Sequence, residues 1–298
     1  MSKVILMPRK AMFAGQFYEA NAQALEKQIA ECFAGKNGPG DLPLSKRTKH
    51  IQAIIAPHAG YTFSGQCAAW AYKEIAESEF ADLYIILGPN HNSRASAVSM
   101  QGYETPSGLV RVDQEFAKAL LEKNTDLKVD EEVHAAEHSI EVQLPFLQFA
   151  TADNMHALKI LPIIIGDIDY NKLGLDIKET IIESGKKVII IASSDFTHYG
   201  HNYHYIPFST DVKKSIYEMD RKAIGFIENL DANGFMGFVD ETQATICGAF
   251  PIAVLLKALG KSKVELIQYY TSADLEAETL PEGKQYKNSV SYAAIVFN

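Results

Sequence analysis

The sequence predicts an α/β fold, a three-layer α/β/α sandwich built on a mostly parallel central sheet. Four segments are rich in Ile, Val, Leu and Ala and carry few polar residues: 51–56, 82–88, 158–166 and 186–193. Such continuous apolar strands are typical of a sheet whose two faces are both covered. Helical patterns alternate with them, which places helices on both faces. At 298 residues the chain suits one large domain, and we expect a single domain over 1–298.

Local patterns place the other elements in order. In the first half they are a helix at 22–34, a flexible Gly- and Pro-rich loop at 35–49, a helix at 64–78, a short strand at 97–100, and helices at 113–123 and 137–150. Pro57 ends the first buried strand because it cannot donate a ladder hydrogen bond. Ser64 is the predicted N-cap of the helix that follows, and Pro145 is expected to kink or break the 137–150 helix. The second half adds helices at 171–185, within 210–239 and at 247–259, and strands at 263–271 and 288–297.

Composition excludes several classes of protein. The formal net charge of −9 argues against a nucleic-acid surface and against binding to anionic membranes. No apolar stretch approaches the roughly 20 residues that span a bilayer, and residues 1–15 lack the apolar region and cleavage site of a signal peptide. The three cysteines, Cys32, Cys67 and Cys247, are widely spaced and odd in number, so a disulfide framework is not expected. We therefore expect a cytoplasmic protein.

Polar side chains follow three of the apolar strands at the point where each strand ends. His58 follows the first strand, His91 follows the second, and Asp195 and His198 follow the last. Ligands of open α/β sheets bind outside the carboxyl ends of the strands, so these side chains are expected to share a pocket.

Cys247 is expected to open an apolar helix, where the helix dipole and free N–H groups lower the pKa of a thiol. Two imidazoles, a carboxylate and a thiolate make a mononuclear metal site, suited to iron, copper or zinc and unsuited to magnesium or calcium. Two alternatives use the same residues without metal. In the first alternative, Cys247 is a nucleophile, His198 is its base, and Asp195 orients the ring of His198. In the second, Cys247 is simply a small buried apolar residue.

A competing motif lies at 134–138, where HAAEH matches the H-x-x-E-H pattern of inverted zinc peptidases. Such a site needs a long helix, and Pro145 interrupts this one. We therefore expect His134, His138 and Glu141 to share a helical face and to line the pocket or support its ligands, rather than to form a peptidase zinc site.

Seven short motifs are spread over nearly the whole chain: AGQFY at 14–18, APHAGYTFSG at 56–65, LGPNH at 87–91, EHSIEVQLPF at 137–146, SSDFTHYG at 193–200, TICGAFP at 245–251 and SVSYAA at 289–294. In these motifs the chain resembles the Memo family, named for a mediator of cell motility, whose prokaryotic branch is the AmmeMemoRadiSam system protein B. The family's fold is similar to the catalytic subunit of class III extradiol dioxygenases, non-haem iron enzymes that open catechol rings.

The resemblance implies roles residue by residue. The family's metal-binding histidines match His58 and His91, and its cysteine ligand matches Cys247, while Asp195 and His198 match the aspartate and histidine that line the same pocket. The related dioxygenases use two histidines and a carboxylate, so a cysteine here replaces the carboxylate.

Two functions of different class follow. The first is a cytosolic metal-binding redox protein, an oxidoreductase using iron, with copper or zinc as alternatives, in which His198 moves protons. The second is a non-catalytic module whose vestigial metal pocket binds a peptide or partner protein. The ligand itself, a small molecule or a peptide, is not identified by the sequence. The resemblance also implies radical-SAM and AMMECR-type partner proteins.

Overall fold

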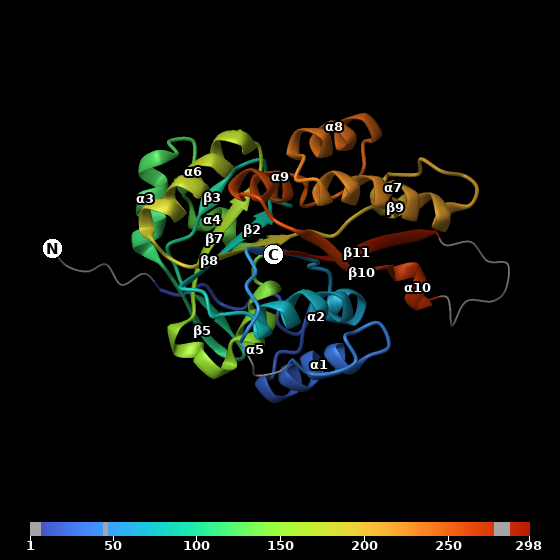
Figure 1. Ribbon diagram of the computed structural model, residues 1–298. Coiled ribbons are helices and arrows are strands. Elements are labelled where there is room, and N and C mark those ends of the chain that lie inside the picture. Colours follow the sequence, from blue (N-terminus) through green and yellow to red (C-terminus); the bar gives the residue numbers. More distant parts are fainter. Residues whose placement is uncertain (1–6, 44–46, 277–286) are drawn as a thin grey trace.

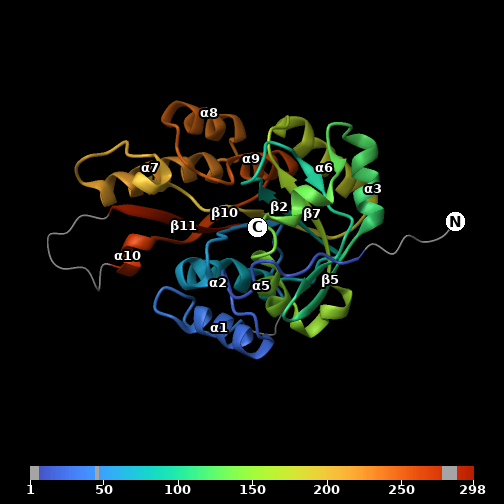
Figure 2. The same ribbon diagram turned by 180° about the vertical axis from the view of Figure 1, so that it is seen from behind.

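The computed structural model describes residues 7–43, 47–276 and 287–298. Within these residues, eleven strands form one sheet with helices on both faces (Figures 1 and 2). The main path of the sheet runs β10-β11-β1-β8-β2-β7-β3-β6. The predicted α/β fold with helices on both faces of a central sheet is therefore confirmed.

The four apolar segments predicted as strands form the centre of the sheet: β1 (Ala53–Ala56), β8 (Val188–Ser193), β2 (Leu83–Pro89) and β7 (Lys159–Ile165). Each is parallel to its neighbour in this order. Nearly every residue in them is buried, as expected for strands covered on both faces. Because all four run in one direction, their carboxyl ends lie along one edge.

Mixed pairing extends this parallel centre. On one side β11 (Asn288–Phe297) is antiparallel to β1, to β10 (Val264–Thr271) and to β9 (His198–Gly200). On the other side β3 (Ala97–Val98) is antiparallel to β7, while β5 (Gly108–Val112) is parallel to it. β6 (Lys128–Val129) pairs with β3, and β4 (Tyr103–Thr105) pairs with β5. The short strands β4, β5, β6 and β9 carry little periodicity and were not predicted.

Two helical layers bury the sheet (Figure 1). One face is covered by α1 (Ala22–Ala34), α2 (Tyr61–Glu77) and α5 (Gln143–Ala150). The other is covered by α3 (Gln114–Lys123), α6 (Tyr170–Ser184), α7 (Val212–Glu228), α8 (Ala232–Thr242) and α9 (Ala249–Ala258). Short helices α4 (Glu131–Ala135) and α10 (Ser272–Glu276) and the 3₁₀ turns η1 (Ala152–Ala157) and η2 (His201–Tyr203) lie in the connections.

Three local predictions are corrected. Ser64 is not an N-cap, because α2 begins at Tyr61 and Gly60 precedes it, and the Ser64 hydroxyl donates to the carbonyl of Ala59. Pro145 does not break a helix over 137–150. It lies in the first turn of α5, where proline is tolerated because the first N–H groups of a helix have no partner within the helix. Cys247 precedes α9 rather than opening it, since Gly248 is the N-cap.

The loop predicted as flexible, 35–49, includes residues 44–46, which lie outside the described part of the chain. In the described part, the carbonyl of Asn37 accepts hydrogen bonds from Trp70 on α2 and Gln268 on β10. Across all the described residues, no helix has the length and apolar character required to traverse a bilayer.

One packing prediction concerns Gly174, where α6 crosses α9. A Cβ at this position would lie 2.4 Å from the Lys257 Cβ and 2.8 Å from the carbonyl oxygen of Val254. Gly174→Ala is therefore expected to lower the free energy of unfolding by about 1–3 kcal/mol, because the two helices must separate. Gly225→Ala on α7 is the matched control, since a Cβ added there would have nothing within 4 Å. It should be neutral or stabilise by up to about 1 kcal/mol. Urea denaturation measures both; equal effects would contradict the close crossing.

Candidate metal centre

Three neighbouring parallel strands bring polar side chains to one edge of the sheet. β1, β8 and β2 are adjacent, and His58, Asp195 and His91 each lie two residues beyond the last residue of these strands. The ring centroids of His58 and His91 are 5.3 Å apart. The side chains predicted from three separate strand ends therefore do share one site.

The ring of His58 is held by a buried serine. Its Nδ1 lies 2.8 Å from the Oγ of Ser193. The Ser193 hydroxyl donates its one proton to the carbonyl of Ser139 at 2.7 Å, so the contact with His58 requires Nδ1–H to be the donor. In the neutral ring Nε2 then carries the lone pair. Burial lowers the pKa of His58 well below its usual range, and the neighbouring His91 acts in the same direction, so the ring is neutral at physiological pH.

Cys247 faces this lone pair. Its Sγ is 3.2 Å from the Nε2 of His58 and accepts the backbone N–H of Asp195 at 3.3 Å. The predicted lowering of the Cys247 pKa is wrong. Burial raises the pKa of this thiol well above its usual range, and the nearby Asp195 adds to the effect. The backbone N–H groups around the sulfur oppose the shift but do not outweigh burial.

Asp195 and His198 have separate partners. The Asp195 carboxylate accepts the backbone N–H of His58 at 2.9 Å, and burial raises the pKa of this acid. His198 Nδ1 donates to the carbonyl of Thr245 at 2.9 Å, which leaves Nε2 as the acceptor in the neutral ring. The imidazole in contact with the Cys247 sulfur is thus His58, whereas the nucleophile alternative placed His198 there.

Glu137 was not singled out as a supporting residue, and it orients His91. Its carboxylate accepts the His91 backbone N–H at 2.7 Å and lies 2.9 Å from the His91 Nδ1. The Glu137 side chain is fully buried. Burial opposes ionisation, but the hydrogen bonds from His91 prevail and lower the pKa of Glu137 to about 2. An ionised acceptor keeps the proton on the His91 Nδ1 and directs the lone pair of Nε2 to the other side of the ring. In the sequence, the feature that could have indicated this role is the glutamate of the HAAEH motif, which is Glu137.

The three residues expected to share a helical face separate in space. α4 ends at Ala135, so a turn carries 136–142 in a different direction. His134 Nδ1 contacts the hydroxyl of Tyr103 and its Nε2 contacts the carbonyl of Ala97, which leaves neither nitrogen for a ligand. Glu141 does not line the pocket; it pairs with Arg9. His138 alone of the three reaches the pocket, and the peptidase arrangement is absent from this segment.

Two sets of metal-ligand atoms overlap at His58 within the described residues. One set is His58, His91 and His138, and the other is His58, Asp195 and Cys247. In each set the ligand atoms lie within 4.8 Å of one another. The predicted ligands His91 and Cys247 thus fall in different sets that share His58. Their assignment as metal ligands stays a prediction.

A cavity of about 450 Å³ adjoins the site, and one residue of each set lines it, His138 and Asp195. Aromatic side chains from distant parts of the chain line it together with His138 and His198: Phe17, Phe63, Tyr203 and Tyr292. A substrate or ligand would approach the sheet edge through this cavity.

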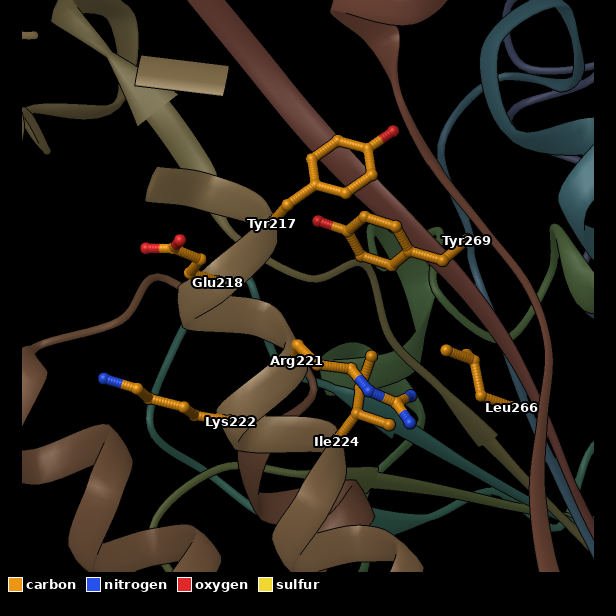
Figure 3. A pocket seen from close by; sticks show the side chains of 7 residues that line it. All are labelled: Tyr217, Glu218, Arg221, Lys222, Ile224, Leu266 and Tyr269. Carbon is orange, nitrogen blue, oxygen red and sulfur yellow. The ribbon is translucent and has the colours of Figure 1, made fainter. Parts of the chain in front are cut away.

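A larger groove of about 620 Å³ lies elsewhere, between α7 and β10, where Tyr217 and Arg221 face Leu266 and Tyr269 (Figure 3). Its lining is mainly apolar and contains none of the ligand sets above. The groove wall is nevertheless connected to the site. The Tyr269 hydroxyl donates to the buried Asp220, which also accepts the hydroxyl of Thr197 at 2.6 Å, next to His198.

Comparison with known proteins agrees with the resemblance in the seven motifs. The family model described as "Memo-like protein" matches residues 9–296. The chain belongs to the Memo family. A MEMO1 family protein of Methanopyrus kandleri is 39% identical over 98% of this chain and 99% of its own length. A relative from Nitrosopumilus maritimus is 36% identical over 98% of this chain and 100% of its own length. A relative from Methanothermobacter thermautotrophicus is also 36% identical, over 91% of this chain and 96% of its own length.

The predicted family is therefore confirmed. The solved structure of an uncharacterized protein from Escherichia coli K12 is also similar, with a TM-score of 0.47 and 14% identity over 81% of this chain and 99% of that one. In this Memo family chain all five predicted site residues, His58, His91, Asp195, His198 and Cys247, lie at or beside the sheet edge described above.

A buried ion pair holds the N-terminal segment over the site. Arg9 and Glu141 pair with side chains 6% and 0% exposed, and Glu141 also accepts the Tyr18 hydroxyl at 2.7 Å and the Phe13 N–H at 2.8 Å. This segment places Phe17 on the ring of His138, with centroids 4.7 Å apart.

Arg9→Met is expected to lower the free energy of unfolding by about 3–5 kcal/mol, because it leaves the Glu141 carboxylate buried without its cation. Lys10→Met is the control: Lys10 pairs with Glu104 at the surface, with side chains 67% and 37% exposed, and its loss should cost less than about 1 kcal/mol. Chemical denaturation of the two variants compares them, and a Lys10 effect as large as that of Arg9 would exclude this explanation.

Proposed function

We propose that this protein binds a transition-metal ion at the sheet edge, iron first and copper or zinc as alternatives, and acts as a non-haem redox protein or oxidoreductase. The observation that carries the proposal is the 3.2 Å contact between the Cys247 Sγ and the His58 Nε2, with Nδ1 of the same ring committed to Ser193. A lone pair on nitrogen and a sulfur that face each other in a buried site form a donor pair suited to such ions.

The donor set supports this choice of metal. Imidazole nitrogen suits iron, copper and zinc, and a thiolate selects against magnesium and calcium. The proposed ligands are His58, which belongs to both sets, with His91 from one set and Cys247 from the other. A bound cation also offsets the cost of keeping the Cys247 thiol and the Asp195 carboxyl ionised in a buried site, because a coordinating thiol deprotonates. When bound, the ion would supply Lewis-acid or one-electron chemistry.

The protein's own groups have distinct tasks in this proposal. Asp195 holds the backbone at His58 in place through the N–H that it accepts. His198 lines the cavity with Nδ1 tied to Thr245, so its Nε2 is the atom that accepts or returns a proton. The aromatic side chains of the cavity exclude water from around a bound ligand.

The redox role rests on the family resemblance together with this donor set. The cytoplasmic location and the radical-SAM and AMMECR-type partners are further parts of the proposal. The alternative, a peptide- or partner-binding module, shares the cavity but does not require a metal ion, so metal content distinguishes the two.

Elemental analysis of protein purified without added metal tests the proposal directly. We expect iron or copper in the wild type and a reduced content in His58→Ala and in Cys247→Ala, each folded as judged by circular dichroism. Cys67→Ala is the matched control, because Cys67 is a buried cysteine outside both ligand sets. Unchanged metal content in the His58 and Cys247 variants would overturn the proposal and favour the binding module.

A second prediction concerns Glu137. Glu137→Gln keeps the shape of the side chain but removes the charge that orients His91, so we expect metal affinity to fall by about 10–100-fold. The exposed Glu132→Gln on α4 should leave it unchanged. Competition with a chromophoric chelator measures both affinities. Equal affinities for the two variants would show that Glu137 has no part in metal binding.

A further inference from the structure

His138 is the third imidazole of the site, although the predicted ligand set does not include it. Its ring stacks on His91, with centroids 4.5 Å apart and an angle of 22° between the planes. It meets the ring of His58 edge to face, with centroids 5.3 Å apart. The three rings are therefore in mutual contact.

Glu137 contacts two of these rings. Its Oε1 lies 2.9 Å from the Nδ1 of His91 and 3.4 Å from the Nδ1 of His138. The two rings are nearly parallel, and both have their Nδ1 close to this one oxygen, so the same carboxylate lies beside both imidazoles. One ligand nitrogen from each of His58, His91 and His138 falls within 4.8 Å of the other two.

The surroundings of His138 do not give the ring another polar function. In the described part of the chain, its polar contact is the one with Glu137, and the ring otherwise packs between Phe13, Phe17 and the two other imidazoles. His134, by contrast, has a hydrogen-bond partner on each nitrogen. A histidine that lies beside a buried carboxylate and has a ligand nitrogen within 4.8 Å of those of two further histidines has the surroundings of a metal ligand with a supporting acid.

We propose that His138 is a ligand of the metal ion, completing a three-imidazole set with His58 and His91 that shares His58 with Cys247 and Asp195. This inference rests on the proposed metal-binding function. The three imidazoles are neutral donors, and the thiolate and carboxylate supply negative charge beside them. The set is suited to Cu²⁺, Zn²⁺ or Fe²⁺. It also explains why one buried glutamate contacts two histidine rings.

The test uses the full-length protein, freed of metal and titrated with Cu²⁺ alone. The variants are His138→Phe, which keeps an aromatic ring between Phe17 and His91 but removes both nitrogens, and His138→Gln, which removes the ring. His156→Gln is the control, an exposed histidine on η1 outside both ligand sets. Two quantities are measured: the Cu²⁺ dissociation constant, and the number of coordinated imidazole nitrogens from electron paramagnetic resonance.

In the wild type and the His156 variant we expect signals from three imidazole nitrogens. In both His138 variants we expect two, with a dissociation constant raised by more than about tenfold, because loss of a residue that only supports a ligand already costs 10–100-fold. If only His138→Gln weakens binding, the ring serves packing and the inference is wrong. If both variants keep the wild-type affinity and spectrum, the inference is wrong while metal binding stands. A wild type that binds no Cu²⁺, Zn²⁺ or Fe²⁺ would instead overturn the proposed function.

Discussion

The geometry of the site depends on one buried hydroxyl, that of Ser193 at the end of β8. It donates to the carbonyl of Ser139, accepts the side-chain amide of Gln143 at 2.7 Å, and receives the Nδ1–H of His58. These contacts connect the strand to the turn that carries Glu137 and His138, to α5 and to the loop after β1. Because the serine has one proton and its acceptor is a carbonyl, the hydroxyl also decides which nitrogen of His58 faces the sulfur of Cys247.

Two buried glutamates, four residues apart, stabilise different parts of the site. Glu137 orients His91, while Glu141 holds the segment 9–18 through Arg9, Tyr18 and backbone N–H groups. Both are charged acceptors satisfied by several donors, the condition under which a buried carboxylate is tolerated. The N-terminal segment in turn supplies Phe13 and Phe17, which pack against His138. A surface segment thus becomes one wall of the cavity.

The electrostatics of the pocket favour neutral side chains over ionised ones. Burial raises the pKa values of Asp195 and Cys247 and lowers that of His58, so every one of these groups is displaced toward its neutral form. His138 follows the same rule, since burial, reinforced by His91, lowers its pKa to about 4. The His58 Nε2 lone pair and the Cys247 sulfur, 3.2 Å apart, are nevertheless both donors suited to a divalent transition-metal ion that takes the place of the thiol proton. This complementarity is the physical basis of the proposed function.

The amino-acid sequence was enough to predict the fold class, because continuous apolar strands alternating with helical patterns admit few arrangements other than a sheet covered on both faces. It also determined that His58, His91 and Asp195 meet, because residues just beyond the ends of neighbouring parallel strands share one edge. Strand order was not available from the sequence, and the antiparallel strands at both sides of the sheet follow from long-range pairing that local periodicity does not encode.

The roles of the residues in the 134–141 segment depend on contacts between elements that are distant in the sequence. On a single helix His134, His138 and Glu141 would share a face, but α4 ends at Ala135 and the turn after it sends each side chain to a different neighbour. The pKa of Cys247 is a second case: helix position suggests a thiolate, while burial beside Asp195 has the larger effect. In both cases the deciding interactions join residues far apart in the chain, and such contacts exist only once the strands and helices have packed together.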